Sequence, residues 1–382
     1  MVVTSQSAGQ GSRQGIIAQA RRFWQRVTEG MELGQLWKQF HADARASYRL
    51  YQRDFNTHSP RETRRGHFFQ TAQAFAWALL EKLTPARRVL LILGTVLLLF
   101  PAGDFSHDGK TVVQFDFRFY GGVLLFIVLL LETADRVVMK RDLEIARDIQ
   151  SWLLPAAPPE IPGLQIAFAT RPANTVAGDY YDVFRRPAFE QTHFLLAVAD
   201  VAGKSIPAAL LMATLQASLR TLSATSSTLP ELVNGLNRYA CTNSQGGLRF
   251  TTAFLAEYDP AARNLTYINC GHNNPVLRRT SGEVERLSTG GLPLGIREDA
   301  SYECASITLQ AADWLLIFTD GLVEAFNQSE EEYGELRMLS VLNNGTAATP
   351  TELLHRMMSD LDVFVGATPQ HDDVTCLLVK VS

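Results

Sequence analysis

Two patterns of hydrophobic and polar positions divide this chain, one before residue 155 and one after residue 163. In residues 16–55 and 134–154, apolar side chains recur at the three-to-four spacing of amphipathic helices. From residue 164, short runs rich in β-branched and aromatic residues alternate with turns, which is typical of strands. The runs are LQIAFAT, HFLLAVADV, TTAFLAEYD, LTYINCG, SYECASITL, DWLLIFTDG and VTCLLVKV. The proline-rich segment PAAPPEIPG between the two patterns predicts a domain boundary, because proline cannot continue a helix.

Helices interrupt these strands rather than alternating with them. Residues 206–222 and 230–244 are expected to form a consecutive pair, and a third helix begins at TPTELLHRMM, where Thr349 and Glu352 can form a capping box. The stretch RRTSGEVERL predicts a hairpin that turns at Ser281 and Gly282. Because strands and helices segregate, the pattern predicts an α+β fold, a sandwich of sheets with helices outside.

Two purely apolar runs precede this domain, VLLILGTVLLLF at 89–100 and FYGGVLLFIVLLL at 119–131. Each is shorter than the roughly 20 residues of a typical membrane helix. Basic residues lie outside both runs, at Arg87 and Arg88 and again at Arg136, Lys140 and Arg141. This arrangement follows the positive-inside rule and predicts a two-helix membrane hairpin over 85–132, with both ends cytoplasmic. A soluble helical core or a dimer core is the alternative.

The remaining pattern divides the chain further. We expect a disordered tail at 1–15, a basic helical region at 16–84, and a charged linker helix at 133–155. The linker helix carries an apolar stripe of Val138, Ile145, Ile149 and Trp152, which suits dimerisation through residues 134–154. Packing of this stripe on the next domain is an equally open reading.

Charge changes this picture for the first part of the chain. Residues 1–88 contain 14 Lys+Arg against 6 Asp+Glu, whereas the remainder contains 21 against 33. A basic N-terminal region suggests contact with phosphate or an anionic membrane surface. A helix whose charged face is exposed to solvent would have the same composition. No nucleic-acid recognition motif is visible, so no nucleic-acid partner is expected.

Composition excludes several classes of protein. Hydrophobic residues make up 46% and charged residues 19% of the 382 residues, unlike a disordered or collagen-like chain. The four cysteines form no C-x-x-C pair, and they are expected to be reduced; they are Cys241, Cys270, Cys304 and Cys376. The N-terminal residues lack the apolar segment of a secretory signal.

Carboxylates stand where apolar strands begin or end, often beside glycine. They are Asp179, Asp200, Asp320, Asp372 and Asp373. Brought together, they would repel strongly unless a cation sat among them. Mg²⁺ and Mn²⁺ prefer such oxygen ligands, and two ions can hold a hydroxide and a phosphoryl group for in-line attack. The pattern predicts that Asp200 bridges two metal ions; the alternative is that each aspartate only caps a turn.

Seven segments, in this order, resemble the metal-dependent serine/threonine protein phosphatases, the PPM superfamily. The resemblance is to the bacterial branch typified by the stage II sporulation phosphatase and the stress-response sigma-factor regulators, and it covers residues 140–382. The segments are ARDIQSWLLP, VAGDYYDVF, VADVAGKSIPAALLMA, NCGHNNPVL, GGLPLGI, FTDGLVEAFN and HDDVTCLLV. It implies a two-sheet antiparallel β-sandwich flanked by helices, with the phosphatase domain at 156–382.

The resemblance also implies roles for the aspartates. Asp200 would bridge two Mn²⁺ or Mg²⁺ ions, Asp320 and Asp372 would complete one site, and Asp179 with the carbonyl of Val201 would complete the other. Asp373 belongs to the same metal-binding motif and would ligate a metal or orient its neighbour. The predicted catalytic residues are Asp200 and Asp320, and a metal-bound hydroxide would attack phosphoserine or phosphothreonine directly.

Several positions depart from the family pattern. Ala202 replaces a histidine credited as general acid in eukaryotic members, and Arg171 is only a weak match to their phosphate-binding arginine. Lys204 or a metal-bound water are hypotheses for protonating the leaving group. Ser205 stands where glycine is usual.

Two histidines near these motifs are less informative. His272 is interpreted as structural rather than as a general acid, and His371 as either an outer-shell group or a surface residue.

The function implied is a protein phosphatase that acts on a phosphorylated STAS-type anti-anti-sigma regulator. A catalytically inactive, phosphatase-like signalling scaffold is the alternative. The predicted membrane hairpin places the protein at the inner membrane, with its catalytic domain in the cytoplasm; without that hairpin, the protein would be cytoplasmic.

Overall fold

The computed structural model describes residues 77, 80, 82–100, 103–107, 110–186, 193–243, 249–343 and 349–382. The predicted tail at 1–15 and nearly all of the predicted basic region at 16–84 lie outside the described residues. The chain divides into two units, residues 1–132 and 133–382, and each is described by itself.

The described part of the first unit contains two helices joined by a β-hairpin. Helix α4 spans Pro85–Leu99, strands β1 (Gly103–His107) and β2 (Lys110–Phe115) pair antiparallel, and helix α5 (Phe117–Leu153) starts in this unit and continues into the second. The hairpin of strands was not predicted from the sequence.

The predicted membrane hairpin over 85–132 falls on α4, the β-hairpin and the first part of α5. Among the described residues, no helix combines the length and the apolar character that a membrane crossing requires. Helix α4 has 15 residues, which corresponds to about 22 Å of helix against a hydrocarbon core of about 30 Å. The apolar run in α5 ends at Leu131, and the helix continues with charged residues from Glu132.

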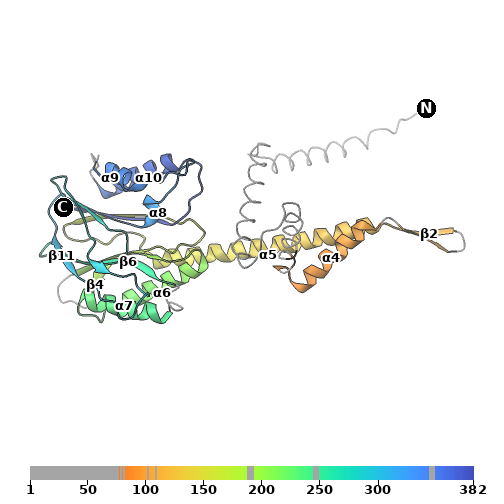
Figure 1. Cartoon of the computed structure of the whole chain (residues 1–382), viewed down its shortest axis with the longest axis horizontal. Coiled ribbons are helices and arrows are strands. Elements are labelled where there is room, and N and C mark those ends of the chain that lie inside the picture. The colour runs from red at the N-terminus through yellow and green to blue at the C-terminus, as the bar shows by residue number, and fades with distance from the viewer. Residues whose placement is uncertain are drawn as a thin grey trace, which may run out of the picture. The chain divides into compact units, whose positions relative to one another are not determined.

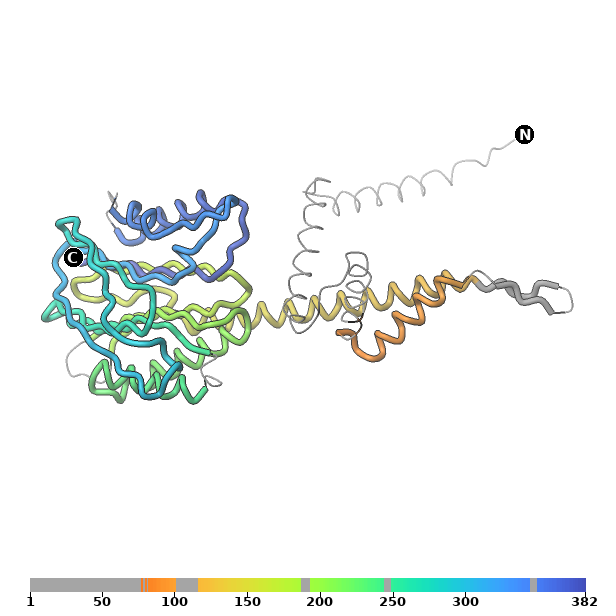
Figure 2. Tube along the Cα trace, viewed as in Figure 1, coloured from red at the N-terminus to blue at the C-terminus, as the bar shows by residue number. Residues whose placement is uncertain are grey.

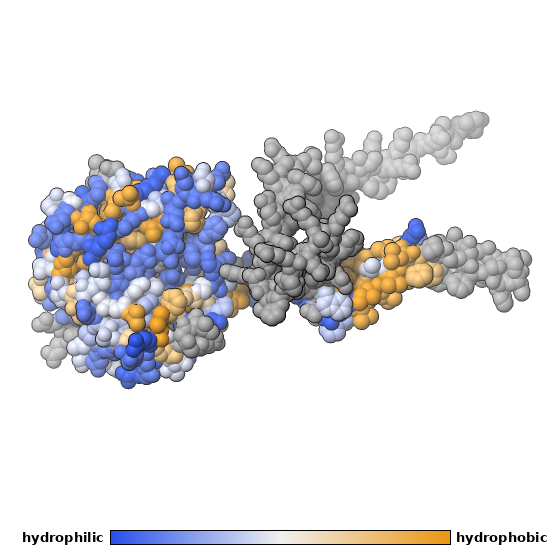
Figure 3. Space-filling model, in the orientation of Figure 1, coloured by the Kyte–Doolittle hydropathy of each residue, from blue (hydrophilic) through white to orange (hydrophobic). Residues whose placement is uncertain are grey.

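Glycines bring α4 and α5 together within the first unit. A Cβ added to Gly121 would lie 2.8 Å from the carbonyl oxygen of Gly94 and 2.9 Å from the amide nitrogen of Leu98. Arg87 and Glu132 form an ion pair at 3.3 Å between the same helices. Many apolar side chains remain exposed on both helices, and part of them form a continuous orange patch in Figure 3.

The second unit consists of two sheets with helices on both sides (Figure 1). One sheet has the order β10-β7-β6-β5-β4, with β11 also paired to β7, and the other has the order β3-β13-β12-β8-β9. Strands of the first sheet are β4 (Tyr180–Arg186), β5 (His193–Val201), β6 (Thr251–Asp259), β7 (Asn264–Cys270), β10 (Gly290–Gly291) and β11 (Ala305–Thr308). Strands of the second are β3 (Leu164–Arg171), β8 (Val276–Arg278), β9 (Val284–Arg286), β12 (Trp314–Phe318) and β13 (Val374–Val381).

The pairings are antiparallel, apart from the short parallel contact of β10 with β7. The two sheets therefore have the antiparallel character that was expected, with this one short exception. The first and last strands of this unit are neighbours, since β3 pairs with β13 along its whole length (Figure 2). The predicted hairpin at Ser281 and Gly282 is confirmed by the pairing of β8 with β9.

Three apolar clusters explain this layering. One lies between the sheets and includes Leu196, Phe254, Ile317 and Leu377. A second packs the other face of the first sheet against α6 (Ile206–Ser223) and α7 (Leu229–Asn243), and a third packs the second sheet against α9 (Gly334–Asn343) and α10 (Pro350–Val365). Strands β5, β12 and β13 are buried on both faces, which is why their sequences are continuous apolar runs.

The ends of the helices place several motif residues. Thr349 accepts a hydrogen bond from the Glu352 amide, and the Glu352 side chain accepts one from the Thr349 amide, so the predicted capping box is confirmed. The apolar run suggested that Asp320 closes strand β12, but the strand ends before this residue. It is the first residue of the short helix α8 (Asp320–Val323), because the backbone turns directly after Phe318.

Candidate active site

The predicted aspartates lie at the ends of strands from both sheets. Asp179 directly precedes β4, and Asp200 lies at the end of β5 in the same sheet. Asp320 follows β12, and Asp372 and Asp373 precede β13, which is the antiparallel neighbour of β12. The sandwich therefore brings acidic residues from four separate segments toward one edge.

Two glycines permit close approach at this edge. A Cβ added to Gly178 would lie 3.1 Å from the carbonyl oxygen of Val201 and 3.7 Å from Oδ1 of Asp200. A Cβ added to Gly321 would lie 2.1 Å from the carbonyl oxygen of Asp373, an impossible contact that only glycine avoids. These contacts place two predicted ligands beside the loop of Asp179, and the start of α8 against the Asp372–Asp373 backbone.

Electrostatics identify Asp200 as the centre of the group. Burial raises its pKa to about 7, and repulsion from Asp320, Asp372 and Asp373 contributes to the rise. Burial and the charge of Asp200 raise the pKa of Asp179 well above its usual range, and burial and Asp372 raise that of Asp320. Burial and repulsion between neighbouring carboxylates therefore both raise the pKa values of these three residues.

Hydrogen bonds orient the two most buried carboxylates. Thr319, itself fully buried, donates its hydroxyl to Oδ2 of Asp179 at 2.9 Å. Both oxygens of Asp373 accept backbone amides, from Ala173 at 2.7 Å and from Gly178 at 2.6 Å. Asp373 thus ties the loop that carries Asp179 to the start of β13, which favours a positioning role over direct ligation.

Asp372 is more exposed and has a cationic neighbour. Its Oδ2 lies 3.1 Å from Nζ of Lys204, which also donates to the carbonyl of His371 at 2.6 Å. Lys204 is thus beside a predicted ligand, as its hypothetical role in protonating the leaving group requires. The imidazole of His371 packs edge-on against Phe326.

The side chains do not form a preassembled metal site. Within the described part of the chain, no three His, Cys, Asp or Glu side chains converge closely enough to hold a metal ion. The ligand set of Asp179, Asp200, Val201, Asp320, Asp372 and Asp373 therefore stays a prediction. The donors themselves, carboxylate and carbonyl oxygens, have the chemistry that hard divalent cations prefer.

Two other residues considered for the site, a candidate phosphate-binding arginine and a candidate general acid, contact other side chains instead. Arg171 forms a two-pronged ion pair with Asp362, at 2.5 and 3.1 Å, rather than extending to the aspartates. His272 is fully buried, its Nδ1 lies 2.9 Å from the hydroxyl of Thr252, and burial lowers its pKa to about 4. These contacts support the structural interpretation of His272.

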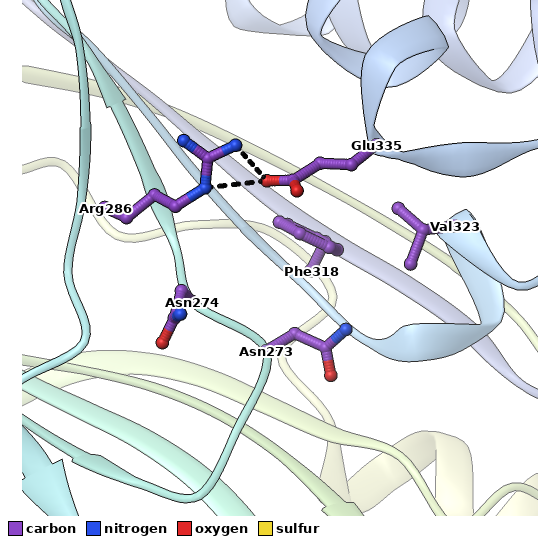
Figure 4. A pocket seen from close by; sticks show the side chains of 6 residues that line it. All are labelled: Asn273, Asn274, Arg286, Phe318, Val323 and Glu335. Atoms are coloured by element: carbon purple, nitrogen blue, oxygen red, sulfur yellow. Dashed lines mark hydrogen bonds and ion pairs between the residues drawn. The ribbon is translucent and has the colours of Figure 1, made fainter.

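A small cavity of about 120 Å³ lies beside the segment that follows His272 (Figure 4). Asn273, Asn274 and Phe318 line it, together with Arg286 and Glu335, which form an ion pair at 2.7 Å. No predicted metal ligand faces this cavity, so it is separate from the acidic group.

Sequence reasoning missed two residues that support the site. Thr319 lies inside the quoted FTDGLVEAFN segment but carries no charge to attract attention. Gln150, in ARDIQSWLLP, is buried; it donates to the carbonyl of Ala177 at 2.7 Å and accepts from the Ala177 amide at 3.0 Å. Its only signal in the sequence was an uncharged polar residue on the face of the helix opposite the apolar stripe.

Comparison with known proteins identifies the family. The family model described as Stage II sporulation protein E (SpoIIE) matches residues 190–382, just over half of the chain. The chain belongs to the SpoIIE family. This result confirms the resemblance to the bacterial sporulation and sigma-factor-regulator branch of serine phosphatases.

Individual relatives within and around this family are distant. The chain is similar to phosphoserine phosphatase RsbU of Bacillus subtilis, with 27% identity over 63% of this chain and 70% of RsbU. It is 25% identical to phosphoserine phosphatase RsbP of the same organism and to protein IcfG of Synechocystis, again over 63% of this chain. The matches span only 58% of RsbP and 42% of IcfG.

Solved structures show the fold. The SiaA-PP2C domain of Pseudomonas aeruginosa matches 65% of this chain and 99% of its own, with a TM-score of 0.57 and 20% identity. The structure of the PP2C phosphatase domain and a fragment of the regulatory domain of SpoIIE from Bacillus subtilis matches 57% of this chain and 63% of its own, with a TM-score of 0.50 and 19% identity. The second unit therefore has the PP2C-like α+β fold of two sheets and flanking helices.

Proposed function

We propose that residues 140–382 act as a metal-dependent phosphatase for phosphoserine and phosphothreonine in proteins. The observation that carries this proposal is the placement of acidic residues from four separate segments at one edge of the sandwich, where burial and mutual repulsion raise the pKa of Asp179, Asp200 and Asp320. Several buried like charges are costly unless a cation neutralises them. Membership of the SpoIIE family, and the phosphoserine phosphatases RsbU and RsbP among the relatives, support the same chemistry.

The oxygen donors fit two Mn²⁺ or Mg²⁺ ions. Asp179 and the Val201 carbonyl would hold one ion, Asp320 and Asp372 would hold the other, and Asp200 would contact both. When bound, such ions neutralise the phosphoryl oxygens and lower the pKa of water.

The protein's own groups hold this arrangement in place. Thr319 fixes one oxygen of Asp179, and Asp373 fixes the backbone at Ala173 and at Gly178. Lys204 carries protons on Nζ beside Asp372, and we assign to it the protonation of the departing serine or threonine oxygen, with a water as the alternative.

The proposed substrate is a phosphorylated STAS-type anti-anti-sigma regulator. This proposal comes from the resemblance to the sigma-factor-regulator branch and from the similarity to RsbU and RsbP. It places the protein in a signalling pathway that controls transcription.

We further propose that the protein dimerises through α5. The stripe of Val138, Ile145, Ile149 and Trp152 is exposed, with Trp152 reaching 79% exposure. On the other side of the helix, Gln150 contacts the loop that carries Asp179. Association of two α5 helices would thus act on a segment that is bonded directly to the site.

The proposed location is the inner membrane, with the catalytic domain on the cytoplasmic side. Support comes from the exposed apolar side chains of α4 and the first part of α5, since extended exposed apolar surfaces mark interaction sites. The excess of 14 Lys+Arg over 6 Asp+Glu in residues 1–88 would favour an anionic lipid surface.

Hydrolysis of p-nitrophenyl phosphate by the purified full chain tests the enzymatic proposal. We expect activity that depends on Mn²⁺, and we expect Asp200→Asn and Asp320→Asn each to lower kcat by at least about a hundredfold. Asp299→Asn is the matched control, because Asp299 is exposed and pairs only with Arg297 among the described contacts.

A wild-type chain that binds a phosphorylated partner but shows no Mn²⁺-dependent hydrolysis would favour the inactive scaffold instead. Loss of activity in Asp299→Asn as well would show that the assay reports general damage rather than the loss of a ligand.

A further inference from the structure

A groove of about 640 Å³ opens beside the acidic group. It lies between the C-terminal end of α10, the loop at 366–372, the residues after α8, and the end of β3. Gly321 and Asp372 line it, so its inner end is continuous with the candidate active site. The volume lies within the range of about 300–1,000 Å³ that is usual for ligand pockets.

The groove wall contains apolar and polar residues in similar numbers. Its apolar residues are Ala325, Phe326, Leu361, Val365, Pro369 and Val374. One polar atom in it lacks a partner: the hydroxyl oxygen of Thr368 is buried and makes no hydrogen bond to any described residue. This hydroxyl is therefore available for a hydrogen bond with a ligand in the groove.

Charge in the groove is nearly balanced. Apart from Asp372, the lining contains the cations Arg171 and Lys204 and the carboxylates Glu324 and Asp362. Arg171 is already paired with Asp362, and Lys204 with Asp372. An occupant is therefore selected by shape and apolar contact rather than by net charge.

Hydrogen bonds hold the groove open before anything binds. Nε2 of Gln370 donates to the carbonyls of Arg171 and Asp372, each at 2.7 Å, and Lys204 donates to the carbonyl of His371. These bonds fix the loop at 366–372. The loop therefore loses little conformational entropy when a ligand binds.

We propose that this groove binds the polypeptide that flanks the phosphorylated residue of a protein substrate, with an apolar side chain against Phe326 and Val365. This inference rests on the proposed phosphatase function. A phosphoserine whose phosphate reaches the acidic group has its neighbouring residues at Gly321 and Asp372, where the groove begins. A free backbone amide or carbonyl of that segment is the partner for Thr368.

Three substrates distinguish binding in the groove from the chemical step. They are p-nitrophenyl phosphate, a phosphoserine heptapeptide with leucine on both sides, and the same peptide with glycine in place of leucine. We expect the wild-type full chain to prefer the leucine peptide by about tenfold in kcat/KM, the effect of an apolar anchor in a pocket. Val365→Arg fills the groove, and we expect it to abolish this preference while p-nitrophenyl phosphate hydrolysis changes less than about twofold.

Val363→Arg is the matched control, since Val363 lies on the same helix, is 78% exposed and does not line the groove. It should retain the preference. If Val365→Arg fails to fold, Thr368→Val tests the same groove, and we expect kcat/KM for both peptides to fall about threefold or more without an effect on the aryl phosphate.

The proposal is overturned if the wild type shows no preference between the peptides, or if the preference survives Val365→Arg or disappears in Val363→Arg. A groove that serves a small molecule or a second copy of the chain would give such a result. Absence of Mn²⁺-dependent p-nitrophenyl phosphate hydrolysis by the wild type would instead overturn the phosphatase function itself, and the groove assignment with it.

Discussion

Ser205, the residue before helix α6, has a backbone conformation that side chains avoid. Its φ is 64° and its ψ is −144°, and its side chain makes no capping hydrogen bond. This region of φ and ψ is nearly exclusive to glycine and costs about 1–3 kcal/mol for other residues. The serine found where the family usually has glycine is therefore strained at the start of the helix that follows Asp200.

Ser205→Gly is expected to stabilise the protein by about 1 kcal/mol, because relief of strain exceeds the added flexibility of the unfolded chain. The measurement is the free energy of unfolding from urea titration. Ser151→Gly, in the last turn of α5 and exposed, should have the opposite sign. Equal effects of the two substitutions would contradict the assignment of strain to Ser205.

His272 should make stability depend on pH. Its pKa is lowered from 6.5 to about 4 in the folded protein, so the unfolded chain binds more protons between these values. Its contribution is complete above pH 6.5 and is lost as the pH falls toward 4. We expect the wild type to lose about 2 kcal/mol more than His272→Gln between pH 7 and pH 5, from one buried imidazole.

Urea titration of the metal-free protein at both pH values measures this difference. The comparison uses the change with pH in each protein, so a general destabilisation by the substitution cancels. Identical pH dependence in the two proteins would show that His272 is accessible to protons in the folded state.

At the scale of elements, α5 presents different residues to different surroundings. Gln150 is 7% exposed and bonded to both polar backbone groups of Ala177, whereas Ile145 and Ile149 are each 49% exposed. Ala177 and Gly178 immediately precede Asp179. One turn of this helix is therefore bonded directly to the loop of a predicted metal ligand.

Gln150→Ala is expected to raise the Mn²⁺ concentration for half-maximal activity by about tenfold, as removal of groups that orient metal ligands does elsewhere. Saturating Mn²⁺ should largely restore kcat, because the ligands themselves remain. Ser151→Ala, at the neighbouring exposed position, is the control. A fall in kcat that Mn²⁺ does not restore would assign Gln150 to folding or to the chemical step.

Elements with strong local patterns were predicted well from the sequence. Strands β5, β6 and β13, the helix pair α6 and α7, and the cap of α10 lie within a residue or two of their expected places. Each has a continuous apolar run, a helical repeat or a capping signal, which local sequence determines.

Elements that depend on tertiary contacts were missed. Strand β4 contains two tyrosines, an aspartate and two arginines, and it is defined by its pairing with β5. The two-residue β10 exists only because Gly290 packs against the Asn269 backbone. Likewise, the sequence marked the aspartates as a group, but the roles of Thr319 and Gln150 follow from contacts across more than 20 residues.

At the scale of the whole molecule, the long helix α5 belongs to both units of the chain. Its first part is apolar and exposed in the first unit, and its last turns contact the catalytic unit through Gln150. A signal received by the first unit would therefore reach the loop of Asp179 along this one continuous helix.

Cell fractionation tests the proposed membrane attachment. We expect the full chain to sediment with membranes and a chain of residues 140–382 to stay in the supernatant, because the latter lacks the exposed apolar surface of α4 and early α5. Mn²⁺-dependent hydrolysis of p-nitrophenyl phosphate is measured on both fractions. Recovery of the full chain in the supernatant would contradict membrane attachment.

Charged substitutions in the exposed stripe of α5 test whether association and activity are linked. We expect the double substitution of Ile145→Asp and Ile149→Asp to shift the full chain from dimer to monomer in sedimentation velocity, because four carboxylates would face one another across the interface. Since Gln150 lies next to Ile149, we expect the Mn²⁺ requirement to change together with the oligomeric state. Ser151→Asp adds a charge outside the stripe and should alter neither property. Coupling through α5 is wrong if the double substitution leaves both association and activity unchanged. A monomer with unaltered Mn²⁺ dependence would show that α5 mediates dimerisation without affecting the metal requirement.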